Sequence, residues 1–144
     1  MQKKTYAVLG LGRYGAAVAK ELVKNGTDVI AVDNNEQIVQ DAAAYLPICK
    51  CADVTDPEVI SALGISNADV VIVAMASNLE ESILAITLCK EKGVKTVIAK
   101  CANETHRKIM KRVGADKVVF PESESGTRPL TSWSLTSARF RQTT

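Results

Sequence analysis

Short apolar runs alternate with helix-like segments along most of this 144-residue chain, and this alternation constrains its fold more than any other feature. Each apolar run has the length of a buried strand, and each intervening segment carries apolar residues at helical spacing. Strands separated by helices form a parallel sheet covered on both faces, because parallel neighbours need a crossover connection. The expected strands are residues 5–9, 29–32, 47–51, 70–75, 96–100 and 117–120.

We therefore predict an α/β fold, a Rossmann-like doubly wound parallel sheet of six strands. Right-handed crossovers leave few topologies for such a chain, and 3-2-1-4-5-6 is the strand order that we expect. Residues able to cap a helix support this interpretation, because they stand where helices should begin. They are Asn34 or Asn35, Asp56, Asn78 and Asn103.

The first strand-to-helix connection is a glycine-rich turn, Gly10-Leu11-Gly12-Arg13-Tyr14-Gly15. In such a turn Gly10 permits the tight bend, Gly12 lets the backbone approach a diphosphate, and Gly15 allows close helix packing. The helix N-terminus adds N–H groups and a partial positive charge. Asp33 follows Gly15 by 18 residues, the spacing of a carboxylate that binds ribose hydroxyls and disfavours the 2′-phosphate of NADP. The sequence thus predicts an adenine nucleotide site.

Two charged residues near this turn have alternative interpretations. Asp53 follows the third strand, at the sheet edge where ligands bind, and can accept a hydrogen bond from the adenine amino group. Its alternative is a carboxylate that stabilises a local turn. Arg13 can meet a terminal phosphate as a bidentate partner, or it can be a solvent-exposed side chain.

Composition argues against several other functions. The net charge of +2 and the lack of a basic stripe interleaved with aromatic residues give no indication of nucleic-acid binding. No apolar run approaches the roughly 20 residues of a membrane span, and the first run is too short for a signal peptide. We therefore expect a cytosolic chain. His106, the single histidine, is expected on a solvated helix surface, and no catalytic set can be assembled around it.

The four cysteines are expected to be small buried residues in a reducing compartment. The Cys49-x-Cys51 pair would share one face of a strand, so a metal site is the alternative. A tetrahedral set would need a second close pair of cysteine or histidine residues, which the sequence does not offer. The cysteines are Cys49, Cys51, Cys89 and Cys101.

Several groups of residues resemble, in order, the motifs of RCK domains, also called KTN or TrkA-N domains. These domains are cytosolic regulators of bacterial potassium channels and transporters. The resemblance covers residues 5 to about 126 and implies an RCK N-lobe over residues 1–126. The matching groups are Gly10–Gly15, Val32-Asp33, Ala52-Asp53 with Thr55-Asp56, Val71–Ala74, and Gly114-Ala115-Asp116 with Pro121-Glu122.

The resemblance is strongest to Ktr-type members, and it implies regulation instead of catalysis. In these members the ligand is ATP or ADP, and dimers assemble into an octameric ring on a membrane potassium-translocating subunit. The chain would then be cytoplasmic and peripheral to the inner face of the cell membrane. A γ-phosphate would favour one dimer geometry, so the nucleotide would act through its different affinity for two states.

The resemblance also implies roles for individual residues. Arg13 matches an arginine that contacts the γ-phosphate from the neighbouring subunit, and Glu122 matches a residue tied to a divalent cation such as Mg²⁺. Lys100 matches a position that lines the nucleotide pocket. The candidate nucleotide-binding residues are Gly10, Gly12, Arg13, Tyr14, Gly15, Asp33, Asn34, Ala52, Asp53, Ala74, Lys100 and Glu122, of which Glu122 is also the candidate metal ligand.

The chain departs from the family pattern near its end. The family continues with an apolar crossover helix, whereas residues 127–144 are rich in Ser, Thr and Arg and have no clear periodicity. We interpret residues 127–144 as an atypical tail, either truncated or non-native, with a docked role for Trp133 left open. The usual C-terminal ligand-binding lobe is also absent, which suggests an isolated N-lobe of a longer protein.

Two other functions fit the same turn and carboxylate. One is an NAD- or NADH-binding regulatory domain of the Trk type. The other, from a different class, is the cofactor domain of an NAD-dependent dehydrogenase fragment. Arg13 favours ATP over both, because a triphosphate gives its guanidinium a target.

Overall fold

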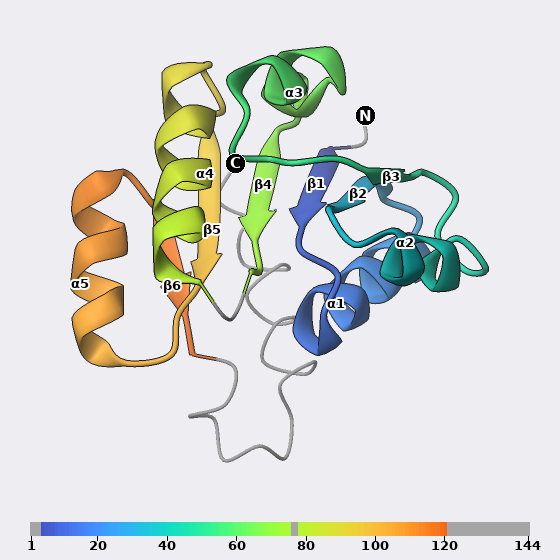
Figure 1. The fold of residues 1–144 in the computed structure, drawn as a ribbon, viewed down its shortest axis with the longest axis horizontal. Coiled ribbons are helices and arrows are strands. Elements are labelled where there is room, and N and C mark those ends of the chain that lie inside the picture. The colour runs from blue at the N-terminus through green and yellow to red at the C-terminus, as the bar shows by residue number, and fades with distance from the viewer. Residues whose placement is uncertain (1–3, 76–77, 121–144) are drawn as a thin grey trace.

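The computed structural model describes residues 4–75 and 78–120, and these residues form one parallel sheet in the order β3-β2-β1-β4-β5-β6 (Figure 1). The predicted fold class and strand order are confirmed. The order reverses between β1 and β4, the point at which such sheets bind ligands. The strands are β1 (Thr5–Leu9), β2 (Asp28–Asp33), β3 (Cys49–Cys51), β4 (Val70–Val73), β5 (Thr96–Lys100) and β6 (Lys117–Val119).

Three strands are shorter than the sequence predicts; β6 ends at Val119 instead of Phe120. Strand β3 begins at Cys49 instead of Pro47, because proline has no N–H to donate to the sheet. Strand β4 ends at Val73, two residues before the predicted Met75, where the chain turns out of the sheet.

Helices connect the strands, and side-chain caps begin most of them. Asn35, and not Asn34, caps the second helix by accepting a hydrogen bond from the N–H of Ile38. None of the helices within residues 4–75 and 78–120 has the length and apolar character needed to cross a membrane. The helices are α1 (Arg13–Lys24), α2 (Glu36–Ala42), α3 (Pro57–Ala62), the 3₁₀ turn η1 (Ile65–Asn67), α4 (Leu79–Glu91) and α5 (Glu104–Val113).

Two apolar cores lie on opposite faces of the sheet. Ala7 and Leu9 of β1 face a core closed by α3, α4 and α5, whereas Tyr6 and Val8 face a core closed by α1 and α2. All four residues of β4 are buried, because helices cover both faces of this central strand. Both faces of the sheet are therefore covered, and the loops lie where the strands begin and where they end.

The same pair of hydrogen bonds is made twice at the edge where the strands begin. The backbone N–H of Asp69 donates to the carbonyl of Thr5, while the N–H of Thr5 donates to the Asp69 carboxylate, each at 2.8 Å. Asp116 makes the same pair of bonds with Val97, again at 2.8 Å. Each aspartate thus satisfies a backbone donor at the start of a strand.

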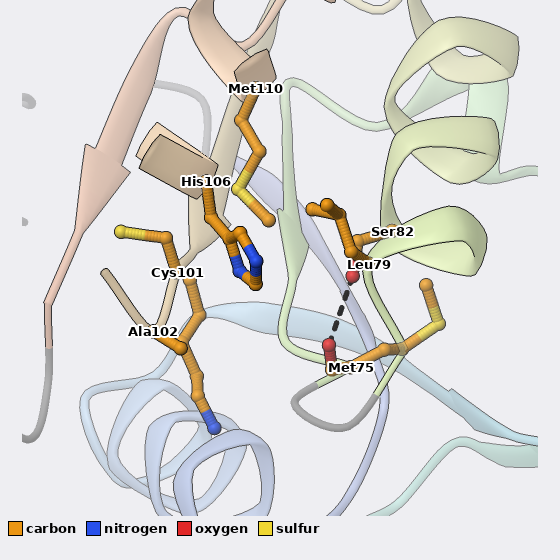
Figure 2. A pocket seen from close by; sticks show the side chains of 8 residues that line it. Met75, Leu79, Ser82, Cys101, Ala102, His106 and Met110 are labelled. Carbon is orange, nitrogen blue, oxygen red and sulfur yellow. Dashed lines mark hydrogen bonds between the residues drawn. The ribbon is translucent and has the colours of Figure 1, made fainter. Parts of the chain in front are cut away.

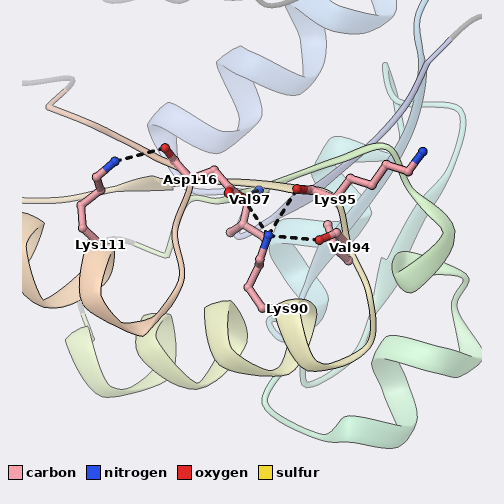
Figure 3. A network of polar contacts seen from close by, with 6 residues as sticks. All are labelled: Lys90, Val94, Lys95, Val97, Lys111 and Asp116. Carbon is pink, nitrogen blue, oxygen red and sulfur yellow. Dashed lines mark hydrogen bonds and ion pairs between the residues drawn. The ribbon is translucent and has the colours of Figure 1, made fainter. Parts of the chain in front are cut away.

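Lys90 extends the Asp116 contacts to the end of α4 (Figure 3). Its Nζ lies 3.0 Å from Asp116 Oδ2 and also donates to the carbonyls of Val94 and Lys95, at 3.3 and 3.2 Å. Both side chains of the ion pair are partly exposed, so the charge attraction itself contributes little. The bond to the buried N–H of Val97 carries most of the stabilisation.

Replacing Asp116 with Ala should lower the free energy of unfolding by about 1–3 kcal/mol, because the N–H of Val97 loses its acceptor. Asp116→Asn retains an oxygen acceptor and should recover most of that loss. Urea unfolding of both variants measures the difference. Equal losses in the two variants would assign the stabilisation to the Lys90 ion pair instead.

Candidate nucleotide-binding site

The glycine turn lies between the carboxyl end of β1 and the N-terminus of α1. Gly10 has a φ of +99°, which L side chains rarely adopt, and its N–H donates to the carbonyl of Val32 at 2.8 Å. A Cβ at Gly10 would also lie 3.0 Å from the backbone of Ala74 and of Met75. The turn is therefore closed against the ends of both neighbouring strands.

The other two glycines of the turn differ in what surrounds them. A Cβ at Gly15 would lie 1.8 Å from the carbonyl oxygen of Gly10, so only glycine allows α1 to pack this closely. A Cβ at Gly12 would meet no atom within 4 Å. Gly12 thus leaves its side of the backbone open to an approaching ligand.

The N-terminus of α1 differs from those of the other α-helices within the described residues. Helices α2, α3, α4 and α5 each begin with an Asn or Asp side-chain cap and carry at least one glutamate in the first turn. Helix α1 has Gly12 as its N-cap, with no side-chain cap and no acidic residue in its first turn. No carboxylate of its own first turn offsets the partial positive charge of α1, which favours an anion there.

Asp33 connects the carboxyl end of β2 to this turn. Its Oδ2 accepts from the N–H of Leu11 at 2.7 Å, and its Oδ1 accepts from the N–H of Asn35 at 2.9 Å. The backbone carbonyl of Asp33 also accepts from the N–H of Ala52 at 3.0 Å. The carboxylate therefore shapes the turn while remaining half-buried at the ligand edge of the sheet.

Asp53 forms a local turn with Thr55. Its Oδ1 accepts from the Thr55 hydroxyl at 2.6 Å and from the Thr55 N–H at 2.9 Å. The hydroxyl bond, with the backbone bond adding to it, lowers the pKa of Asp53 below its ordinary value. Asp53 therefore stabilises a local turn, as one of its two interpretations expected. Both bonds are made by Oδ1, and the residue is exposed.

Lys100 and Tyr14 bring the end of β5 to the glycine turn. Lys100 is buried, and its Nζ lies 5.8 Å from the centre of the Tyr14 ring, an arrangement in which a cation is attracted to an aromatic face. Ala74, buried beneath the turn, donates its N–H to the carbonyl of Leu9 at 2.8 Å. A positive charge is thus held next to the turn in surroundings with little water.

The remaining predicted site residues are less closely joined to the turn. Arg13 is exposed in the first turn of α1, and Asn34 is exposed just after β2. Ala52 is half-buried next to Asp33. Glu122, the candidate metal ligand, lies outside the described residues, as does the tail 127–144.

A small pocket opens beside the glycine turn, between the N-terminal ends of α4 and α5 (Figure 2). His106 is half-buried and its ring points into this pocket, which corrects the expectation of a solvated histidine. The sequence could not predict this position, because His106 becomes part of a pocket wall only when α5 packs against α4. The lining residues are Met75, Leu79, Ser82, Lys100, Cys101, Ala102, His106 and Met110.

The cysteines follow the expectation in part. Cys89 and Cys101 are buried, and burial raises the pKa of the Cys89 thiol to about 12. Cys49 is only half-buried and Cys51 is exposed, because β3 is a sheet edge. Burial, and then the charge of Asp33, raise the pKa of Cys49, which keeps this thiol protonated. Within residues 4–75 and 78–120, no three His, Cys, Asp or Glu side chains are grouped to hold a metal ion.

Comparison with known families and proteins gives a consistent result. The family model described as "TrkA-N domain" matches residues 6–121. Ktr system potassium uptake protein C of Bacillus subtilis is 40% identical over 126 residues, which cover 88% of this chain and 57% of that protein. Ktr system potassium uptake protein A of Vibrio alginolyticus is 38% identical over 125 residues, with 87% and 57% covered. The chain thus spans little more than half the length of these relatives.

Solved structures share the fold at low sequence identity. The TrkA-N domain of the Escherichia coli inner membrane protein ybaL matches with a TM-score of 0.75 and 16% identity, covering 94% of this chain and 97% of that one. The GsuK channel bound to NAD matches with a TM-score of 0.72 and 14% identity, covering 82% and 21%. GsuK bound to ADP matches with a TM-score of 0.69 and 14% identity, covering 83% and 32%.

Two glycine substitutions should separate folding from ligand binding. Gly15→Ala should cost about 3 kcal/mol or more, because its Cβ would overlap the Gly10 carbonyl. Gly12→Ala should stay within about 1 kcal/mol of wild type in urea unfolding. The same variant should bind nucleotide more weakly, because its methyl group would occupy the open side of the turn. Unchanged ATP binding in Gly12→Ala would show that no phosphate approaches there.

Proposed function

The chain belongs to the TrkA-N domain family, and from this premise we propose that it is the nucleotide-binding regulatory module of a bacterial potassium uptake system. The ligand is an adenine nucleotide, ATP or ADP, whose phosphates bind at the N-terminus of α1. Nucleotide binding would control a partner, and the chain itself would carry out no reaction.

The observation that carries this proposal is the uncapped N-terminus of α1. Helices α2, α4 and α5 begin with side-chain caps and glutamates, whereas α1 has an open glycine as its N-cap and no carboxylate in its first turn. Backbone N–H groups and the helix dipole favour phosphate at such a position. Lys100 adds a buried positive charge beside the turn.

Asp33 is proposed to bind the ribose. Each of its carboxylate oxygens accepts one backbone N–H and has a further lone pair for a ribose hydroxyl. The same negative charge would repel a 2′-phosphate, which favours nucleotides with free ribose hydroxyls. Asn34, Ala52 and Asp53 would border the adenosine from the adjacent loops.

Arg13 is proposed to distinguish ATP from ADP. Its side chain is exposed at the first helical position, where it can extend along α1 toward a terminal phosphate or across to a second subunit. A guanidinium contacts phosphate through two parallel hydrogen bonds. A γ-phosphate held in this way, with Glu122 and Mg²⁺ contributing, would favour one arrangement of a dimer.

The partner is proposed from the relatives, which are named as potassium uptake proteins. We propose a membrane potassium-translocating subunit as that partner, with this chain on its cytoplasmic side. Self-association as a dimer, and as an octameric ring in a longer protein, would convert the nucleotide state into a change of geometry.

A dinucleotide is the second candidate ligand, and the pocket of Figure 2 favours it. This pocket lies over the ends of β4 and β5, across the switch point from Asp33, and borders the turn through Met75 and Lys100. A dinucleotide could place its second half there. NAD is also named with the GsuK channel, a protein of the same fold.

The test is thermal unfolding with ATP, ADP, AMP, NAD and NADH, each with and without Mg²⁺. A ligand at 100 times its dissociation constant should stabilise the folded chain by about 2.7 kcal/mol. The largest shifts are expected with ATP and ADP. A shift dominated by NADH would favour the dinucleotide, and hydride transfer to a carbonyl substrate would contradict a purely regulatory role.

Single substitutions should separate the two ends of the nucleotide. Arg13→Ala should weaken ATP about tenfold while leaving ADP nearly unchanged, because only ATP loses a charge-assisted contact. Asp33→Asn should weaken ATP, ADP and AMP alike, because the ribose is common to all three. Lys24→Ala, at the opposite end of α1, is the matched control for loss of charge. Titration calorimetry measures the affinities; equal losses of ATP and ADP in Arg13→Ala would remove the γ-phosphate role.

A further inference from the structure

Positive charge gathers at one corner of the molecule, at the sheet edge opposite the nucleotide site. The corner is formed where α4 and α5 end and where β5 and β6 begin, all of which lie at the same edge because the connections are parallel (Figure 1). Its cations are Lys90, Lys92, Lys95, Lys111, Arg112 and Lys117.

The acidic residues at this corner do not balance these cations. Three acidic residues, Glu91, Asp116 and Asp69 (the last beside Lys95 at the start of β4), accompany the six cations, so the corner has an excess of three positive charges, whereas the whole chain has a net charge of +2. Asp116 is occupied by Lys90 and by the N–H of Val97. The rest of the chain therefore carries no excess of positive charge.

Fold stabilisation accounts for only part of this cluster. Lys90 and Lys111 donate to the loops around Asp116, at the ends of helices where cations oppose the dipole (Figure 3). Lys92, Lys95 and Arg112 are exposed, and Lys95 points away from the network in the same view. These three side chains are free to contact a second surface without breaking the bonds of the corner.

We propose that this corner, the α4/α5 basic corner, docks on the anionic headgroups of a lipid bilayer. Clusters of four to eight Lys and Arg residues bind anionic membrane surfaces by adding small electrostatic contributions. No aromatic residue stands among the corner residues to stack on a base, which disfavours single-stranded nucleic acid. The inference rests on the proposed function in one respect, because a membrane partner would keep the chain close to lipid.

Docking at this corner would leave the nucleotide edge facing away from the membrane. The glycine turn and Asp33 lie at the carboxyl ends of the strands, and the basic corner lies at their amino ends. The bilayer would therefore orient the chain while its ligand site remains accessible. Such docking would act beside the protein partner and would not require nucleotide.

Vesicle co-sedimentation with the 144-residue chain tests the proposal without any transporter, so its failure would be separate from failure of the proposed function. Wild type should bind phosphatidylglycerol vesicles in low salt, should not bind phosphatidylcholine vesicles, and should be released by about 0.5 M salt. The triple variant Lys92→Gln, Lys95→Gln and Arg112→Gln should bind about tenfold more weakly or worse.

A matched triple variant, Lys20→Gln, Lys24→Gln and Lys50→Gln, removes the same charge on α1 and β3, at the side of the sheet away from β5 and β6. It should bind phosphatidylglycerol nearly as wild type does, and both triple variants should retain wild-type melting temperatures. If both variants lost phosphatidylglycerol binding equally, net charge alone would explain the binding, and the proposal would be overturned. Absence of wild-type binding to phosphatidylglycerol, or preferential binding of an acidic peptide or an oligonucleotide through the same three residues, would also overturn it.

Discussion

The close approach of Gly15 to the carbonyl of Gly10 is the contact on which the candidate site depends. Because no side chain intervenes, α1 begins directly over the end of β1, and its first N–H groups lie at the point where the strand order reverses. Asp33 holds the same turn from β2 through the N–H of Leu11, and Ala74, the residue after β4, packs against it. Sheet pairing brings the ends of β1, β2 and β4 together, and the steric condition at Gly15 brings the N-terminus of α1 to the same place.

Parallel topology also sorts the charges of this molecule. Helices α4 and α5 run opposite to the strands, so the glutamates of their first turns lie where the strands end, and the cations of their last turns lie where the strands begin. Each group opposes a helix dipole locally. Helix α1 departs from the pattern at its N-terminus, where a phosphate would take the place of the missing carboxylate, and the α4/α5 basic corner exceeds what the dipoles alone require.

Much of this could be predicted from local sequence, because the signals were local. The glycine turn, the Asp56, Asn78 and Asn103 caps and the order of strands each depend on neighbours in the chain or on the handedness of crossovers. The errors concern residues whose surroundings come from distant segments. His106 is turned into a pocket by the packing of α5 against α4, and Cys51 is exposed because β3 has a neighbour on one side only.

The sequence by itself determined the α/β class, the family and the position of the glycine turn. These follow from the periodicity of apolar residues, from the order of the motifs and from glycines, which adopt backbone conformations that other residues rarely adopt. Only the tertiary structure decided that Asp53 closes a turn with Thr55, that Lys100 lies buried against Tyr14, and that Lys90 and Lys111 converge on Asp116. These contacts join residues far apart in the chain or choose between two local roles. The Lys100 and Lys90 contacts join elements that meet only after the helices have packed on the sheet, whereas the Asp53–Thr55 turn is local and is one of the two roles expected for Asp53.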